Sequence, residues 1–233
     1  MTNPFTLTKE QYQELYKEVL LFSQIGGVVA DENNLWKMCL EEHSELMLGI
    51  RRGDAQEILD AVCDQFVTFV QLHHYYMSKP TWEQPLTISG IINNCDLLDD
   101  LEERNEAVIL PLLGYWLQSA TLQAEIRGFN LYKAIKEVNR SNMTKYPTLK
   151  SLVTRYRQDN KTNSEFLRLL ACKCEDFSNG KYKNVKAEIV FHSETDNDFH
   201  GKEYVVFREN FGKGKVCKFY PTFQEPNFED CWV

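Results

Sequence analysis

The chain has 233 residues, of which 43% are hydrophobic and 26% charged, and its formal net charge is −8. This composition is ordinary for a soluble globular protein with a sizeable core, and the acidic balance argues against broad binding of nucleic acid through phosphate contacts. No apolar run approaches the length of a membrane span, and residues 1–5 lack the basic start and apolar core of a signal peptide. We therefore expect a cytoplasmic protein that binds neither nucleic acid nor a membrane.

The first part of the chain reads as three helices. The segment from Thr8 to Gln11 has the pattern of a capping box, and apolar residues then recur at helical spacing up to a glycine pair. A second helix is expected from about Asn34 to Arg51. A third is expected from about Asp54 to His74, with Asp54 as its N-cap. The third helix is apolar nearly all round, which is typical of a helix buried within a bundle.

Six carboxylates gather on the second and third of these helices. Within each helix most of them are three or four residues apart, so they share a face. Such a concentration of negative charge is repulsive unless water or a cation compensates it, and ligands that are all oxygen favour Mg²⁺ or Mn²⁺ over zinc. The sequence therefore predicts a metal site suited to phosphate chemistry; a solvated acidic face is the alternative. The six residues are Glu41, Glu42, Glu45, Glu57, Asp60 and Asp64.

The later part of the chain changes character. After two proline breaks, helices are expected from about Leu110 to Gly128 and from Leu131 to Val138. Beyond Pro147, a helix from about Asn163 to Cys174 precedes segments that alternate as strands. We expect these strands to form a small antiparallel sheet from residues 184–191, 203–207 and 215–219.

Five short segments carry a family resemblance. The stretch Glu41 to Glu45 (EEHSE) followed by Glu57 to Asp60 (EILD) has an EExxE…ExxD pattern, and Asp60 to Asp64 (DAVCD) is similar to a DALAD-type segment. Glu137 to Lys145 (EVNRSNMTK) closely resembles EVHRSNMSK, and Gly214 to Pro221 (GKVCKFYP) is similar to a GKVLKGPxY-type tail. In this order, the segments resemble the all-α NTP pyrophosphatases, the superfamily of MazG-like enzymes, dimeric dUTPases and phosphoribosyl-ATP pyrophosphatases.

The resemblance implies a mainly α protein with a four-helix-bundle-like core. The core domain is expected at residues 1–147 and the small α+β C-terminal extension at residues 148–233. In short family members the DALAD helix runs almost directly into the last core helix, and the tail closely follows the SNMSK segment. Here both connections are longer, so a helical insertion is expected at about 77–108. The resemblance also implies a homodimer or homotetramer.

The reaction implied by the resemblance is Mg²⁺-dependent hydrolysis of a nucleoside triphosphate to the monophosphate and pyrophosphate, with Mn²⁺ as the alternative ion. Glu42, Glu45 and Asp60 would hold the metal. Two alignments remain open for the further ligand on the third helix, which is Glu57 in one and Asp64 in the other. Glu41 is the candidate base for the attacking water. The residues expected to bind substrate are Lys37, Arg140, Asn142 and Lys145.

Two other interpretations stay open. The same fold could act on a phosphoribosyl nucleotide or on an alarmone such as (p)ppGpp. Alternatively, the chain could be a non-catalytic module that binds a nucleotide or a protein, because a family scaffold can persist without its activity.

Overall fold

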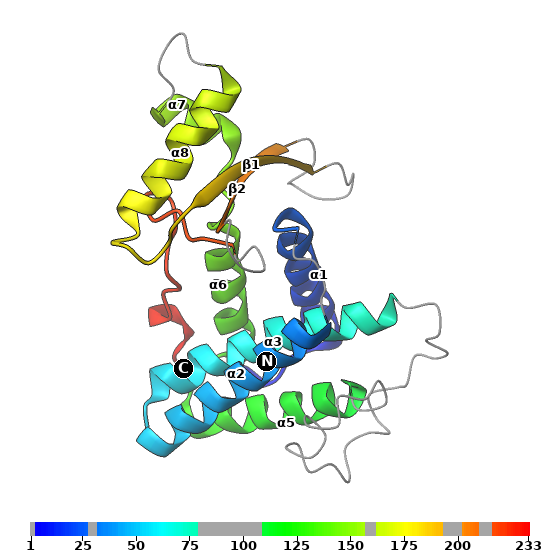
Figure 1. The fold of residues 1–233 in the computed structure, drawn as a ribbon. Helices are drawn as coiled ribbons and strands as arrows, with labels where there is room; N and C mark the ends of the chain where they lie inside the picture. Colours follow the sequence, from blue (N-terminus) through cyan, green and yellow to red (C-terminus); the bar gives the residue numbers. More distant parts are fainter. Residues whose placement is uncertain (1–2, 28–31, 79–108, 157–161, 193–201, 210–215) are drawn as a thin grey trace. The chain divides into compact units, whose positions relative to one another are not determined.

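The computed structural model describes residues 3–27, 32–78, 109–156, 162–192, 202–209 and 216–233. This part of the chain contains seven α-helices and one antiparallel sheet of two strands, as Figure 1 shows. The expected mainly α fold with a small α+β part near the C-terminus is thereby confirmed. The insertion expected at about 77–108 lies outside the described residues, apart from Met77 and Ser78.

The chain divides into two compact units. The first consists of residues 1–21, 29–139 and 227–233, and the second of residues 22–28 and 140–226. The last residues of two helices, α1 and α6, are counted with the second unit. The division therefore does not follow the order of the sequence, because the C-terminal seven residues belong to the first unit.

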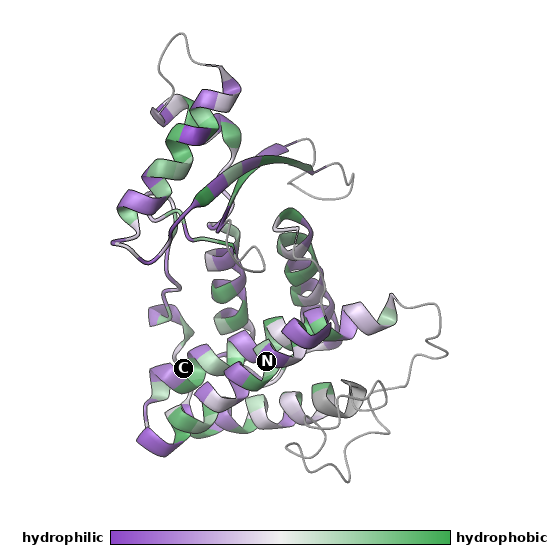
Figure 2. Cartoon of the chain, in the orientation of Figure 1, coloured by the Kyte–Doolittle hydropathy of each residue, from purple (hydrophilic) through white to green (hydrophobic). Residues whose placement is uncertain are grey.

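Five helices make up most of the first unit. They are α1 (Lys9–Ile25), α2 (Glu32–Arg52), α3 (Ala55–Met77), α5 (Ile109–Arg127) and α6 (Leu131–Met143). Figure 2 shows hydrophilic and hydrophobic residues mixed along α1 and α2, as expected for helices with one polar and one apolar face.

Helix α3 is the centre of this unit. It packs against both α2 and α5. From α1, the Tyr12 ring meets Phe66 edge-on with ring centroids 5.8 Å apart. From α5, Trp116 Nε1 donates a hydrogen bond of 3.1 Å to the carbonyl of Val62. Neighbours on several sides explain why α3 is apolar nearly all round, as the sequence predicted.

Local signals place the starts of α1 and α3. Thr8 and Gln11 form the predicted capping box, with reciprocal backbone-to-side-chain bonds of 2.9 and 3.2 Å. Asp54 is the N-cap of α3 and accepts from the backbone N–H groups of Gln56 and Glu57. Gly53 precedes it with φ +71°, a conformation that favours glycine and lets the chain reverse between α2 and α3.

Helix α6 continues beyond the expected end at Val138, as far as Met143. The C-terminal segment returns to this region. Within the first unit, Asn130 N donates to the Cys231 carbonyl at 2.6 Å, and Val233 N donates to the Gly128 carbonyl at 2.7 Å. These bonds make residues 227–233 an integral part of the first unit.

The second unit contains two helices and the sheet. The elements are α7 (Leu149–Tyr156), α8 (Asn163–Phe177), β1 (Val185–His192) and β2 (Lys202–Glu209). Side chains of α7, α8 and β2 share a core with the segment after β2, where Phe207 and Phe219 stack with centroids 4.6 Å apart. The expected third strand at 215–219 is reduced to a single bridge between Arg208 and Val216 among the described residues. Beside this bridge, Cys217 N donates to the Phe207 carbonyl at 2.8 Å, and Phe219 packs its ring in the core, so a short pairing and packing together hold this segment.

No described helix is both long enough and apolar enough to cross a membrane.

Candidate functional site

Helices α2 and α3 form an antiparallel hairpin whose register is fixed by cross-helix contacts. Near the open end, Trp36 Nε1 donates to the Tyr76 hydroxyl at 3.0 Å. In the middle, the Gln65 amide donates to His43 Nδ1 at 3.2 Å. Near the turn, Gly49 faces Ile58.

This register brings acids of the two helices together. With His43 opposite Gln65, Glu42 lies within one helical turn of the level of Asp64. By the same count Glu45 lies within one turn of the level of Asp60.

Gly49 allows the two helices to approach closely beside the acids. A Cβ atom at this position would lie 3.1 Å from Ile58 Cγ1 and 3.2 Å from Ile58 N, closer than carbon atoms normally pack. The glycine is buried. Glycine at this position therefore keeps the carboxylates of α2 and α3 within a short span.

Glu42 is the centre of the acidic cluster. Its side chain is half-buried, and its Oε2 atom is buried with no hydrogen-bond partner in the described part of the chain. The pKa of this carboxyl is raised to about 8, mainly by burial and then by the charges of the surrounding acids in the order Asp64, Glu45, Asp60 and Glu41. An unpaired carboxylate in this position requires a proton or a cation to compensate it.

Glu57 occupies a different environment. Its carboxylate accepts hydrogen bonds of 3.1 and 3.2 Å from Arg52 at the exposed turn between the helices. Its charge is not among those that raise the pKa of Glu42. Glu57 thus serves the start of α3 and a surface ion pair, while Asp60 and Asp64 lie beside Glu42.

Glu41 and Lys37 form an exposed pair on α2. Their charged atoms are 3.7 Å apart, and the two side chains are 58% and 71% exposed. Such an i,i+4 pair on a helix surface contributes only a few tenths of a kcal/mol, about 0.3–0.5. Both side chains are therefore free to exchange this contact for another.

The cluster has the donor chemistry of a site for a hard cation, because its four acids around Glu42 offer only carboxylate oxygens. Among the described residues, however, no three acidic, histidine or cysteine side chains already form a complete metal-binding group. Side-chain rotations of the long Glu42 and Glu45 would have to bring their oxygens inward.

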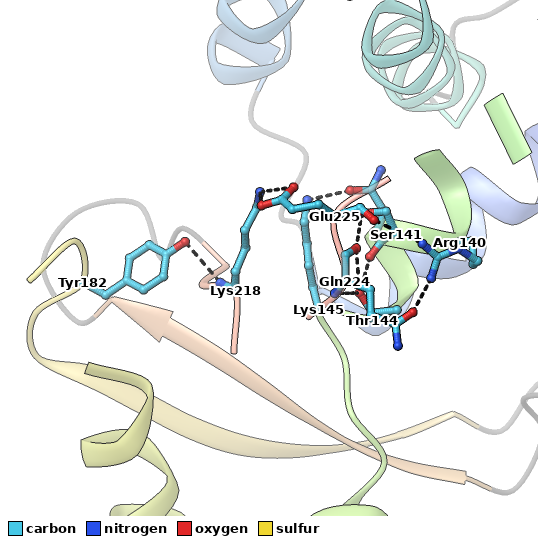
Figure 3. Close-up of polar contacts among 9 residues, drawn as sticks. Arg140, Ser141, Thr144, Lys145, Tyr182, Lys218, Gln224 and Glu225 are labelled. Carbon is cyan, nitrogen blue, oxygen red and sulfur yellow. Dashed lines mark hydrogen bonds and ion pairs between the residues drawn. The ribbon is translucent and has the colours of Figure 1, made fainter. Parts of the chain in front are cut away.

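Of the residues expected to bind substrate, Lys37 lies on α2 in the first unit, whereas Arg140, Asn142 and Lys145 lie at the end of α6 and just after it, in the second unit. Arg140 donates to the Gln224 side chain at 2.6 Å and to the Glu225 carbonyl at 3.3 Å, as Figure 3 shows. Lys145 donates to the Asn142 side chain at 2.6 Å. A role of Arg140, Asn142 and Lys145 beside the acids stays a prediction.

The segment that resembles SNMSK also anchors the C-terminal part of the chain. Ser141 Oγ donates to the Gln224 carbonyl at 2.8 Å, and Gln224 N donates to Thr144 Oγ1 at 2.9 Å. Lys218 forms an ion pair of 3.1 Å with Glu225, which follows Gln224 in the same C-terminal segment. The small hydroxyl residues of this motif thus have a structural use in this chain.

Sequence reasoning missed the pair formed by His43 and Gln65. Gln65 is 3% exposed on α3, directly after Asp64, and its amide spans the helix interface. Burial lowers the pKa of His43, so the imidazole is held neutral. An amide within an otherwise apolar helix was the available signal, because a buried polar group requires a partner.

Comparisons with protein-family models, with curated proteins and with solved structures find no match to this chain.

Proposed function

We propose that this chain is a pyrophosphohydrolase that depends on a divalent cation and cleaves a nucleoside triphosphate to the monophosphate and pyrophosphate. The observation that carries the proposal is Glu42, a half-buried carboxylate among four other acids, with one buried oxygen that has no partner within the described residues. The family resemblance of the acidic helices and of the segment at 137–145 supplies the reaction. A hard cation would neutralise charge on the phosphate oxygens.

The residues that would hold the cation are Glu42, Glu45, Asp60 and Asp64. Of the two alignments that the sequence leaves open, the pair Asp60 and Asp64 is preferred, because these charges act on Glu42 and that of Glu57 does not. Helix α3 is buried on most sides, which holds both aspartates in fixed positions. Ligands on a rigid helix keep the positions that a metal site requires.

Glu41 remains our candidate for accepting the proton of the attacking water. Its exposure and its weak pair with Lys37 leave the carboxylate accessible. Lys37 lies one helical turn from Glu41 on the same helix. Its ammonium group would bind a phosphate oxygen of the substrate beside the cluster. Arg140, Asn142 and Lys145 stay predicted substrate contacts.

The deciding experiment is pyrophosphate release by the purified full chain with Mg²⁺ or Mn²⁺, across the common ribonucleoside and deoxyribonucleoside triphosphates. Glu42→Gln keeps the side-chain shape and removes the charge, so we expect it to abolish release. Glu57→Gln is the matched control on the neighbouring helix. We expect it to retain most of the activity, because Glu57 belongs to the exposed turn.

Each result has a distinct meaning. Release that Glu42→Gln abolishes and Glu57→Gln retains would establish the reaction and the ligand set. Loss in both variants would favour the alternative alignment with Glu57 as a ligand. If no triphosphate is cleaved, phosphoribosyl nucleotides and (p)ppGpp are the next substrates to assay; failure with these as well would contradict catalysis and leave a binding module.

A further inference from the structure

Charge is distributed unequally between the two units. The second unit carries sixteen lysines and arginines against eleven acids, whereas the rest of the chain carries ten against twenty-three. The net charge of −8 is therefore the sum of +5 on the second unit and −13 on the first. An argument from the whole-chain charge against nucleic-acid binding does not apply to the second unit, since binding depends on local charge.

Part of this positive charge is arranged around one aromatic ring. The Arg155 guanidinium and the Lys173 ammonium lie 5.4 and 5.3 Å from the centroid of the Tyr156 ring. The end of α7 supplies two of these residues, and α8 supplies the lysine. The ring is only half-buried, although Phe219 in the core meets it edge-on at 6.0 Å.

Within the described part of this unit, these two cations lack the acidic partners that other basic residues have. Lys218 pairs with Glu225 and Arg208 pairs with Glu188. Among the described residues, neither Arg155 nor Lys173 forms an ion pair, and Arg155 is held instead by a 3.1 Å hydrogen bond to the Pro221 carbonyl. Two adjacent cations without a carboxylate are suited to an anionic ligand.

Further aromatic side chains continue this surface along residues 218–223. Tyr220, next to Pro221, stacks on Tyr182 with centroids 6.3 Å apart and meets Phe223 edge-on at 6.4 Å. Tyr220 and Phe223 are half-buried, and the Lys218 ammonium lies over the Phe223 ring at 4.3 Å from its centroid. We call the set Arg155, Tyr156, Lys173, Tyr220 and Phe223 the basic–aromatic surface.

We propose that the basic–aromatic surface binds single-stranded nucleic acid. Arg155 and Lys173, positioned by the Tyr156 ring, would contact backbone phosphates, while Tyr220 would pack against a base. Surfaces that combine unpaired basic side chains with accessible aromatic rings recognise single strands, because only unpaired bases expose a face for stacking. This activity is independent of the proposed hydrolysis, since all of these residues lie in the second unit.

The test is fluorescence anisotropy of a labelled oligouridylate, with about 12 nucleotides to match common single-strand site sizes. The full chain is titrated between about 50 and 200 mM salt. Arg155→Gln with Lys173→Gln is the test variant, and Lys183→Gln with Lys186→Gln removes the same charge from exposed positions at the start of β1. Tyr220→Leu tests stacking with the charge unchanged.

We expect affinity to fall with salt and the first double variant to lower the slope of log affinity against log salt by about 0.7 per lost contact. The β1 double variant should change it less, and Tyr220→Leu should weaken binding by roughly tenfold. Equal loss in both double variants would overturn the proposal, as would no binding at low salt or equal affinity for a duplex. Light scattering, which measures the oligomeric state, tests one further outcome that would contradict the proposal. A salt-sensitive oligomer that only the Arg155 and Lys173 variant dissociates, without oligonucleotide binding, would assign the surface to the acidic unit of a second copy.

Discussion

The titration of Glu42 makes the stability of the folded protein depend on pH. Because burial and its acidic neighbours raise its pKa from about 4.5 to about 8, the folded protein retains a proton on Glu42 over a range in which the unfolded chain has lost it. The folded state therefore binds more protons than the unfolded state between these two values. In the absence of divalent cations, the contribution of Glu42 to stability falls as the pH rises through this window and levels off above about 8.

We expect Glu42→Gln to remove this dependence. The measurement is the free energy of unfolding of the wild type and the variant from pH 5 to pH 8.5 with a chelator present. The difference between them isolates Glu42, because the lowered pKa values of His43 and His73 act on both proteins alike. If the proposed cation site is correct, Mg²⁺ should stabilise the wild type most at high pH. A pH-independent difference would contradict the raised pKa.

At the scale of elements, the α2–α3 hairpin depends on close approach at Gly49. Gly49→Ala places a methyl group 3.1 Å from Ile58 Cγ1, so the helices must separate by a few tenths of an ångström. Overpacking costs about 1–3 kcal/mol, and the higher helix propensity of alanine offsets about 1 kcal/mol of this. We expect a net loss of up to about 2 kcal/mol in denaturant unfolding. Ser44→Ala, exposed on the same helix, is the control and should not destabilise the protein.

The open end of the same hairpin is held by a buried hydrogen-bond chain. Trp36 Nε1 donates to the Tyr76 hydroxyl, which donates to Glu32 at 2.5 Å. Tyr76→Phe leaves the buried indole N–H without this acceptor, so we expect a loss of about 1–3 kcal/mol in the free energy of unfolding. Tyr75→Phe removes a long 3.4 Å bond to the same carboxylate and should cost less. Equal losses would show that the indole bond is not the cause.

At the scale of the whole molecule, the C-terminal segment belongs to the first unit in spite of its position after the second. Trp232 meets the fully buried Phe129 edge-on at 6.1 Å, and the backbone bonds of Cys231 and Val233 close the turn between α5 and α6. Deleting residues 227–233 should therefore destabilise the first unit.

Hydrogen exchange measures this effect directly. We expect faster exchange at Gly128 to Leu131 in the truncated chain and unchanged exchange in β1 and β2, which lie in the other unit. Trp232→Ala is the milder variant, which removes the ring contact and keeps the backbone bonds. Uniform acceleration across both units would indicate that they unfold together and would contradict a local role of the segment.

Several features were predictable from the sequence because they depend on neighbouring residues. The capping box at Thr8 and Gln11 formed as expected, and so did the N-cap at Asp54. The apolar composition of α3 indicated its burial. Of the strand expected at 215–219, the described residues show only a short pairing with β2 at Val216 and Cys217, since alternation alone does not distinguish a paired strand from an extended segment that packs its rings into a core.

By itself, then, the sequence determined the mainly helical fold and the two consecutive helices that carry the acids, because helix formation depends on contacts three or four residues apart. Only the tertiary structure decided which acids meet. The contact of Gly49 with Ile58 and the bond between Gln65 and His43 set the level of each acid on α2 against those on α3. The tertiary structure also decided how charge is divided between the two units. The net charge summed over the sequence does not record which segments fold together. Such pairings join residues far apart in the chain, so no local pattern encodes them.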